Sequence, residues 1–147
     1  MLRPLSLRQI LNRRRALTSK HREVIHFLAL EPVPTARARV TRWGSYYPKR
    51  TKDWKAAAEK LLPSIPFVFD SLVKVVLVFN CTKPKTGKLL TPRGDLDNHV
   101  KGVLDAITKK GWWTDDKNVI ELHAAKHYNS PPGVHIHVRE METHDLR

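Results

Sequence analysis

Four of the few acidic side chains in this chain fall into two short groups. Asp95 and Asp97 are separated by one residue, and the adjacent pair Asp115 and Asp116 follows about twenty residues later. The whole chain has only 14 Asp and Glu against 27 Lys and Arg. Clustered carboxylate oxygens are the ligands that hard cations such as Mg²⁺ and Mn²⁺ select. In so basic a chain, the two groups predict a divalent-metal site.

The charge of the chain indicates what such a metal would act on. A formal net charge of +13 favours a polyanionic partner. Positive charge that holds a polyanion, together with a metal that attacks it, is what phosphodiester hydrolysis needs, so we expect a metal-dependent nuclease. A membrane is a poorer partner, because the charge is spread along the chain and no apolar run approaches the roughly 20 residues of a transmembrane helix. Cys81 is the single cysteine, which excludes an internal disulfide and a cysteine-rich zinc site and fits the cytoplasm.

The residues around the first acidic pair predict how it is positioned. Apolar residues recur there at helical spacing, so we expect a helix that ends at Gly111 as its C-cap. They are Leu96, Val100, Val103, Leu104 and Ile107. Lys101 would then lie near Asp97 and could stabilise the negative charge of a phosphate. Asp105 falls on the opposite side of the helix and is expected to be solvated.

A purely structural interpretation of the same residues stays open. Aspartate at a helix N-terminus is common capping, and two aspartates in a turn are common loop chemistry. An Asp97–Lys101 pair, four residues apart, can also be a surface salt bridge worth a few tenths of a kcal/mol.

The remaining patterns predict a single small domain over residues 24–147, of the mixed α/β (α+β) class, with a mixed sheet packed against two main helices. We expect strands over 24–30 and 72–79, the second of them central. A helix over 51–62 would start with Thr51 as N-cap. Strands over 118–128 and 134–141 would form a hairpin through the turn at 129–133.

A basic segment follows the first strand and predicts DNA contact. Alternation of Arg37 and Arg39 indicates an extended segment or hairpin with one cationic face, which suits phosphate. The candidate DNA-binding residues are Arg37, Arg39, Arg42, Lys49, Arg50, Lys52 and, beside the acidic motif, Arg93. Aromatic side chains in the same run could stack on unpaired bases or could be packing anchors. They are Trp43, Tyr46, Tyr47 and Trp54.

Two further features have competing interpretations. Residues 1–23 contain seven Lys or Arg and no acid before Glu23. They form a basic N-terminal extension that could be a solvated tail, a DNA-contacting helix or a targeting peptide. The strand histidines could bind zinc, or could form the polar side of the expected hairpin. They are His123, His127, His135 and His137.

Two motifs resemble the RusA family of Holliday junction resolvases. The first is Gly94 to Ile107, which contains D-L-D-N-x-x-K and L-D-A-I, and the second is Gly111 to Val119, with a glycine, an aromatic residue and D-D. Residue types and spacing both agree over about twenty-five positions, and the resemblance extends over roughly residues 24–142. His99 departs from the pattern, because an apolar residue is more usual there.

This resemblance implies a homodimeric, Mg²⁺- or Mn²⁺-dependent endonuclease of bacterial or phage recombination and repair, which nicks four-way junctions symmetrically. It implies that Asp95, Asp97 and Asp116 bind the metal, that Asp115 supports them, and that Lys101 is the catalytic lysine. A nuclease for other branched DNA, such as forks and flaps, is an alternative. A non-catalytic junction-binding protein is another.

Overall fold

A computed structural model describes residues 4, 6–8, 22–87 and 89–142 of the chain. In chain order its elements are β1 (Glu23–Leu28), β2 (Arg39–Thr41), β3 (Gly44–Tyr46), α2 (Lys49–Leu61), β4 (Val73–Cys81), α3 (Leu96–Lys110), the 3-10 helix η1 (Asp116–Asn118), β5 (Val119–Tyr128) and β6 (Gly133–Glu140). The predicted single α+β domain with a mixed sheet and two main helices is confirmed.

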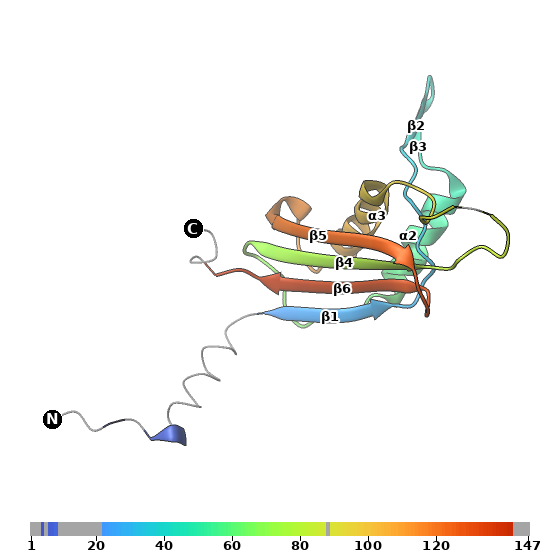
Figure 1. Ribbon diagram of the computed structural model, residues 1–147. Coiled ribbons are helices and arrows are strands. Elements are labelled where there is room, and N and C mark those ends of the chain that lie inside the picture. The colour runs from blue at the N-terminus through green and yellow to red at the C-terminus, as the bar shows by residue number, and fades with distance from the viewer. Residues whose placement is uncertain (1–3, 5, 9–21, 88, 143–147) are drawn as a thin grey trace.

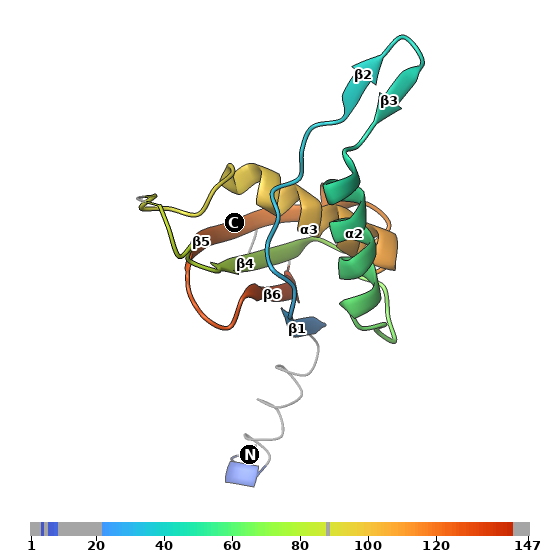
Figure 2. The same cartoon turned by 90° about the vertical axis from the view of Figure 1, so that its right-hand side faces the viewer.

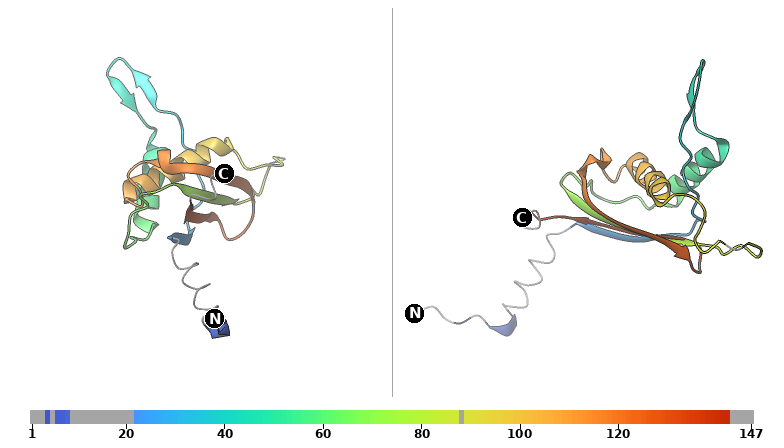
Figure 3. Two further views of the ribbon diagram at one scale, coloured as in Figure 1. Left: turned by 90° about the vertical axis from the view of Figure 1, so that its left-hand side faces the viewer. Right: turned by 45° about the horizontal axis from the view of Figure 1, so that its top comes forward.

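The main sheet has four strands in the order β1-β6-β4-β5 (Figure 1). β4 is central as predicted, pairs antiparallel with β6 and parallel with β5, and β1 pairs antiparallel with β6. Both α2 and α3 lie on the same side of this sheet (Figure 3). Side chains of β4 that face the helices, among them Val75 and Leu77, are fully buried and form the core with Val103 and Ile107 of α3.

The prediction of a hairpin between the last two strands is wrong. Both strands form, but β4 lies between them, so β5 and β6 do not pair with each other. Apolar residues occupy both faces of β4, and few of its residues are charged. This composition suits a strand that has a partner strand on each side. The histidine pairs are therefore not on adjacent strands: His127 is in register with Asn80, and His135 with Val78.

The start of α2 also differs from the prediction. The helix begins at Lys49, with Pro48 in the N-cap position, and its main-chain φ of −54° suits a helix start. Thr51 lies inside the first turn instead of capping it. Its hydroxyl accepts a hydrogen bond from the backbone N–H of Ala36 at 3.2 Å, so it joins two segments of the chain.

α3 ends where the sequence predicts that it ends. It runs from Leu96 to Lys110, and Gly111 ends it in the left-handed conformation (φ 87°), donating its N–H to the carbonyls of Ile107 and Thr108.

Most of the basic extension predicted for residues 1–23 lies outside the described residues, and its three interpretations stay predictions. Across the described part of the chain, no helix is both long and apolar enough to span a bilayer.

Candidate active site

The loop before α3 is held by side chains from the far end of the chain. Lys126 of β5 donates hydrogen bonds from Nζ to the carbonyl of Pro92, at 2.8 Å, and to that of Gly94. The hydroxyl of Tyr128 donates to the carbonyl of Thr91 at 2.9 Å. These bonds fix the chain immediately ahead of Asp95 and therefore set where α3 begins.

The ring of His99 supports the same loop from inside the fold. It is 2% exposed, and its Nε2 lies 3.1 Å from the carbonyl of Arg93, to which it donates as a neutral ring. Burial lowers the pKa of His99, as does the positive charge of Lys126, while the hydrogen bond to Arg93 opposes them. His99 therefore has a structural role, because it holds the loop immediately ahead of Asp95.

An extended segment packs against the first turns of α3 on the other side. The N–H of Thr35 donates to the carbonyl of Asn98 at 3.2 Å. A Cβ added at Gly102 would come 2.3 Å from the hydroxyl oxygen of Thr35, so only glycine permits this approach. The segment that leads into β2 is therefore attached to the helix that carries Asp97.

Two buried tryptophans position the second acidic group. Trp112 donates from Nε1 to the carbonyl of Pro63 at 2.9 Å, and Trp113 donates to the hydroxyl of Thr108 at 2.7 Å. The chain then turns into η1, where the carboxylate of Asp115 accepts the N–H of Lys117 at 2.9 Å. Asp115 thus caps the turn, as the structural interpretation holds for that residue.

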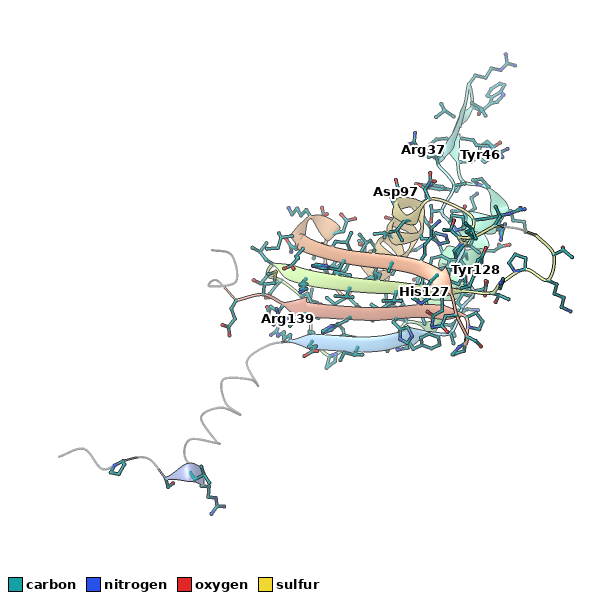
Figure 4. The ribbon with its side chains drawn as sticks, viewed as in Figure 1. Arg37, Tyr46, Asp97, His127, Tyr128 and Arg139 are labelled. Atoms are coloured by element: carbon teal, nitrogen blue, oxygen red, sulfur yellow. The ribbon has the colours of Figure 1, made fainter. Side chains whose placement is uncertain are left out.

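A groove of about 560 Å³ lies between α3, η1 and β5 and brings three of the predicted residues together. Its polar lining consists of Asp97, Lys101 and Asp116. Its apolar lining consists of Leu96, Val100, Leu104, Leu122 and Ala124. Figure 4 shows Asp97 on α3 beneath Arg37 and Tyr46 of the basic segment. Asp95 and Asp115 do not line this groove.

Asp95 occupies the N-cap position of α3, but its side chain makes no capping hydrogen bond. Its carboxylate is exposed beside the groove. The capping interpretation therefore does not account for Asp95, although the backbone carbonyl of this residue accepts the N–H groups of Asn98 and His99.

The surroundings of Asp116 disfavour its charged form. Burial raises the pKa of Asp116, and a hydrogen bond with the side chain of Asp115 raises it further. The negative charges of Asp115 and Asp105 act in the same direction, and Lys101 opposes them. A divalent ion would relieve this repulsion between carboxylates.

The carboxylates of the groove fit one class of metal site. Among the described residues, no group of three or more His, Cys, Asp or Glu side chains is arranged to hold a metal ion. Mg²⁺ is commonly bound through only one or two carboxylates, with water and substrate phosphate oxygens completing its octahedral shell. Asp97 and Asp116 fit that arrangement.

Lys101 and Asp105 differ from their predicted surroundings. Lys101 Nζ lies 3.9 Å from Asp105 rather than pairing with Asp97. Asp105 is half-buried and also pairs with Lys55 of α2 at 3.0 Å, so the prediction that it is solvated is wrong. The reason is that α2 packs against α3 on that side.

The basic segment forms a hairpin, one of the two forms that the sequence left open. β2 and β3 pair antiparallel, and α2 follows them. All seven candidate DNA-binding residues are exposed: Arg37, Arg39, Arg42, Lys49, Arg50, Lys52 and Arg93. Trp54 is buried in the core, as expected of a packing anchor. Trp43 and Tyr46 are exposed, as expected of residues that could stack on bases.

The sequence of this chain matches a known protein family over most of its length. The family description endodeoxyribonuclease RusA matches residues 29–139, which include both acidic groups, α2, α3 and the basic hairpin. The chain belongs to the RusA endodeoxyribonuclease family. A RusA-family relationship was expected over roughly residues 24–142, and the match supports it over most of that span.

A curated relative is the uncharacterized protein YqaN of Bacillus subtilis (strain 168). It is 39% identical over 51 residues, which are 35% of this chain and 35% of that protein. The aligned stretch therefore spans about a third of the length of that relative.

Sequence reasoning missed the residues that hold the RusA motif in place. Lys126 and Tyr128 were assigned only to a strand, and Thr35 was given no role of its own. A signal was present for Lys126, because it shares a strand face with Leu122 and Ala124, where a lysine needs partners inside the fold.

Proposed function

We propose that this protein is a divalent-metal-dependent endonuclease that resolves four-way DNA junctions. The observation that carries the proposal is the groove in which Asp97, Asp116 and Lys101 meet, in a basic chain of the RusA family. An acidic groove in a chain of net charge +13 is suited to a metal ion that is itself bound to a DNA phosphate.

Each polar residue of the groove receives a role. Asp97 and Asp116 would hold Mg²⁺, or Mn²⁺ in its place, and Asp95 would contribute from the edge of the groove through water. When bound, the ion would supply positive charge to the phosphate and lower the pKa of an attacking water. Lys101 would stabilise the charge that develops on the phosphate and on the leaving oxygen. Attack in line with the 3′ oxygen leaves 5′-phosphate and 3′-hydroxyl ends.

The basic residues would orient the substrate. The hairpin and α2 arginines and lysines would bind the DNA backbone, which fixes register without reading sequence. A homodimer would place two such grooves about a twofold axis. A four-way junction has near-twofold symmetry, so each subunit would nick one of two opposed strands.

The proposal is tested with Asp97→Asn and Asp116→Asn on a labelled four-way junction in Mg²⁺. Each change removes a metal-binding charge and keeps the side-chain volume, so cleavage is expected to be abolished while junction binding stays intact. Asp70→Asn is the control, because it makes the same charge change at an exposed position away from the groove, where Asp70 pairs with Arg22 at 3.8 Å. Normal cleavage by either groove variant would refute the assignment.

A further inference from the structure

One tryptophan of this chain is exposed and the other three are buried. Trp43 is 85% exposed, whereas Trp54, Trp112 and Trp113 are 6%, 0% and 1% exposed. Trp43 lies between β2 and β3, at the tip of the hairpin that projects from the body of the molecule (Figure 2). An indole ring this exposed is available to stack on a planar group of another molecule.

The tip is an ordered turn that presents this side chain. The hydroxyl of Thr41 accepts the N–H of Trp43 at 3.2 Å and donates to the carbonyl of Gly44 at 3.1 Å. Gly44 has a φ of 121°, which side-chain-bearing residues rarely adopt. The backbone of Trp43 is therefore fixed at the apex.

A cation lies against the ring. The guanidinium carbon of Arg42 is 4.9 Å from the centroid of the Trp43 ring, a cation–π distance. Arg42 lies over one face of the indole, and the ring as a whole stays exposed enough for a planar ligand to stack on it. Arg42 also places positive charge where the backbone of a stacked nucleotide would pass.

The root of the hairpin is attached to the candidate active site. Thr35 is hydrogen-bonded to the carbonyl of Asn98, next to Asp97, and Ala36 to the hydroxyl of Thr51 in α2. From Ala36 to Trp43 the extended chain reaches at most about 23 Å at ~3.3 Å per residue. At ~3.4 Å per nucleotide step, this reach corresponds to about seven nucleotides of B-DNA between the root of the hairpin and its tip. One DNA molecule can therefore contact both.

We propose that Trp43, backed by Arg42, enters DNA at the branch point and stacks on a base whose neighbour is missing there. This inference rests on the proposed function and deepens it, because it names a residue that selects branched substrates. Inserting a wedge into continuous duplex requires unstacking two base pairs. At a branch point the stack is already interrupted, so the same ring binds there more favourably than in linear duplex.

The charge of the hairpin favours DNA over a second copy of the chain as the occupant. No acid occurs from residue 32 to residue 52. The exposed Arg37, Arg39 and Arg42 would repel the same hairpin of a partner, and they attract phosphate.

The test compares affinities for a labelled four-way junction and for a linear duplex at one salt concentration. All variants are made in an Asp116→Asn background, so that cleavage does not interfere. Trp43→Ala is expected to weaken junction binding about five- to 150-fold, the range given by loss of one base–aromatic stack. Its duplex affinity should not change, and Trp43→Phe should recover part of the loss.

Two matched variants separate stacking from other effects. Val40→Ala removes a neighbouring apolar side chain that is 82% exposed on the same hairpin, and should change neither affinity. Arg42→Gln should weaken binding to both DNAs and reduce the slope of log affinity against log salt by about one.

The outcomes distinguish this inference from the proposed function. Cleavage of the junction by the otherwise unchanged protein in Mg²⁺ tests the function separately. If that cleavage occurs and Trp43→Ala binds the junction normally, the wedge is wrong and the function stands. An equal loss on junction and duplex also overturns the wedge, as does a loss of self-association with unchanged junction affinity.

Discussion

At the residue scale, the same side-chain type has different roles because its partners differ. The carboxylate of Asp115 accepts a hydrogen bond in the turn that it caps, and Asp105 forms an ion pair with Lys55 between α3 and α2. Asp97 and Asp116 face the groove, and the pKa of Asp116 is raised by burial and by its acidic neighbours. The sequence identified all of these aspartates, but only their hydrogen bonds separate candidate metal ligands from structural residues.

Lys101→Ala is expected to slow cleavage about 10²- to 10³-fold, the loss typical of removing one group that stabilises transition-state charge. Stability should change little, because the Lys101–Asp105 pair is long, at 3.9 Å, and 59% of the lysine side chain is exposed. Single-turnover cleavage and urea unfolding measure the two effects. Lys109→Ala is the control, since it removes an exposed lysine of the same helix. Equal slowing by both variants would mean that only overall charge matters.

His99 is expected to make stability depend on pH. Its pKa is lowered in the fold, chiefly by burial, whereas in the unfolded chain it lies near 6.5. The stabilisation is therefore complete above about pH 6.5 and is lost as the pH falls below it, by up to about 1.4 kcal/mol per pH unit for one proton. Urea unfolding in EDTA between about pH 7.5 and about pH 5 measures this loss. His99→Gln keeps an N–H donor but does not titrate, so its curve should be flatter. Curves of equal slope would show that another group is responsible.

At the element scale, local patterns predicted what local interactions determine. The apolar spacing and Gly111 predicted α3, and the apolar run predicted β4. Helix period, capping and strand burial each depend on residues that are close in the sequence, so a local pattern reveals them. The pairing of strands does not depend on neighbouring residues, since β4 lies between β5 and β6 although it precedes them by about forty residues or more. The start of α2 was misplaced for a related reason, because Thr51 serves Ala36 rather than its own helix.

Lys126→Met is expected to impair both the fold and the site. Nζ of Lys126 donates to two carbonyls of the loop before Asp95, and each hydrogen bond to a charged group is worth about 1.5–3 kcal/mol. The free energy of unfolding should therefore fall by at least about 1.5 kcal/mol. Because the loop positions Asp95, half-maximal cleavage should also require more Mg²⁺.

Lys74→Met is the control for Lys126→Met. Lys74 lies on the opposite face of the sheet and pairs with Glu121 at 3.3 Å, away from the loop. Loss of stability without any change in the Mg²⁺ requirement would give Lys126 a structural role only.

At the scale of the whole molecule, the proposed function requires the basic hairpin and the groove to act together, the hairpin binding DNA and the groove holding a metal ion. The segment before the hairpin is bonded to α3 next to Asp97, so the position of the hairpin and that of the groove are linked. Family membership and the groove together support cleavage of DNA. In the proposed function, the shape of the preferred DNA would depend on the hairpin and on a second subunit.

The most direct test of this account is cleavage of a four-way junction, a fork and a linear duplex of matched sequence by the unaltered protein. All three are measured at one salt concentration, because affinity for DNA falls steeply with salt. We predict paired nicks in the junction that depend on added Mg²⁺ and disappear in EDTA, with the linear duplex left intact. Equal cutting of the linear duplex, or no cutting of any substrate across the Mg²⁺ titration, would contradict the account.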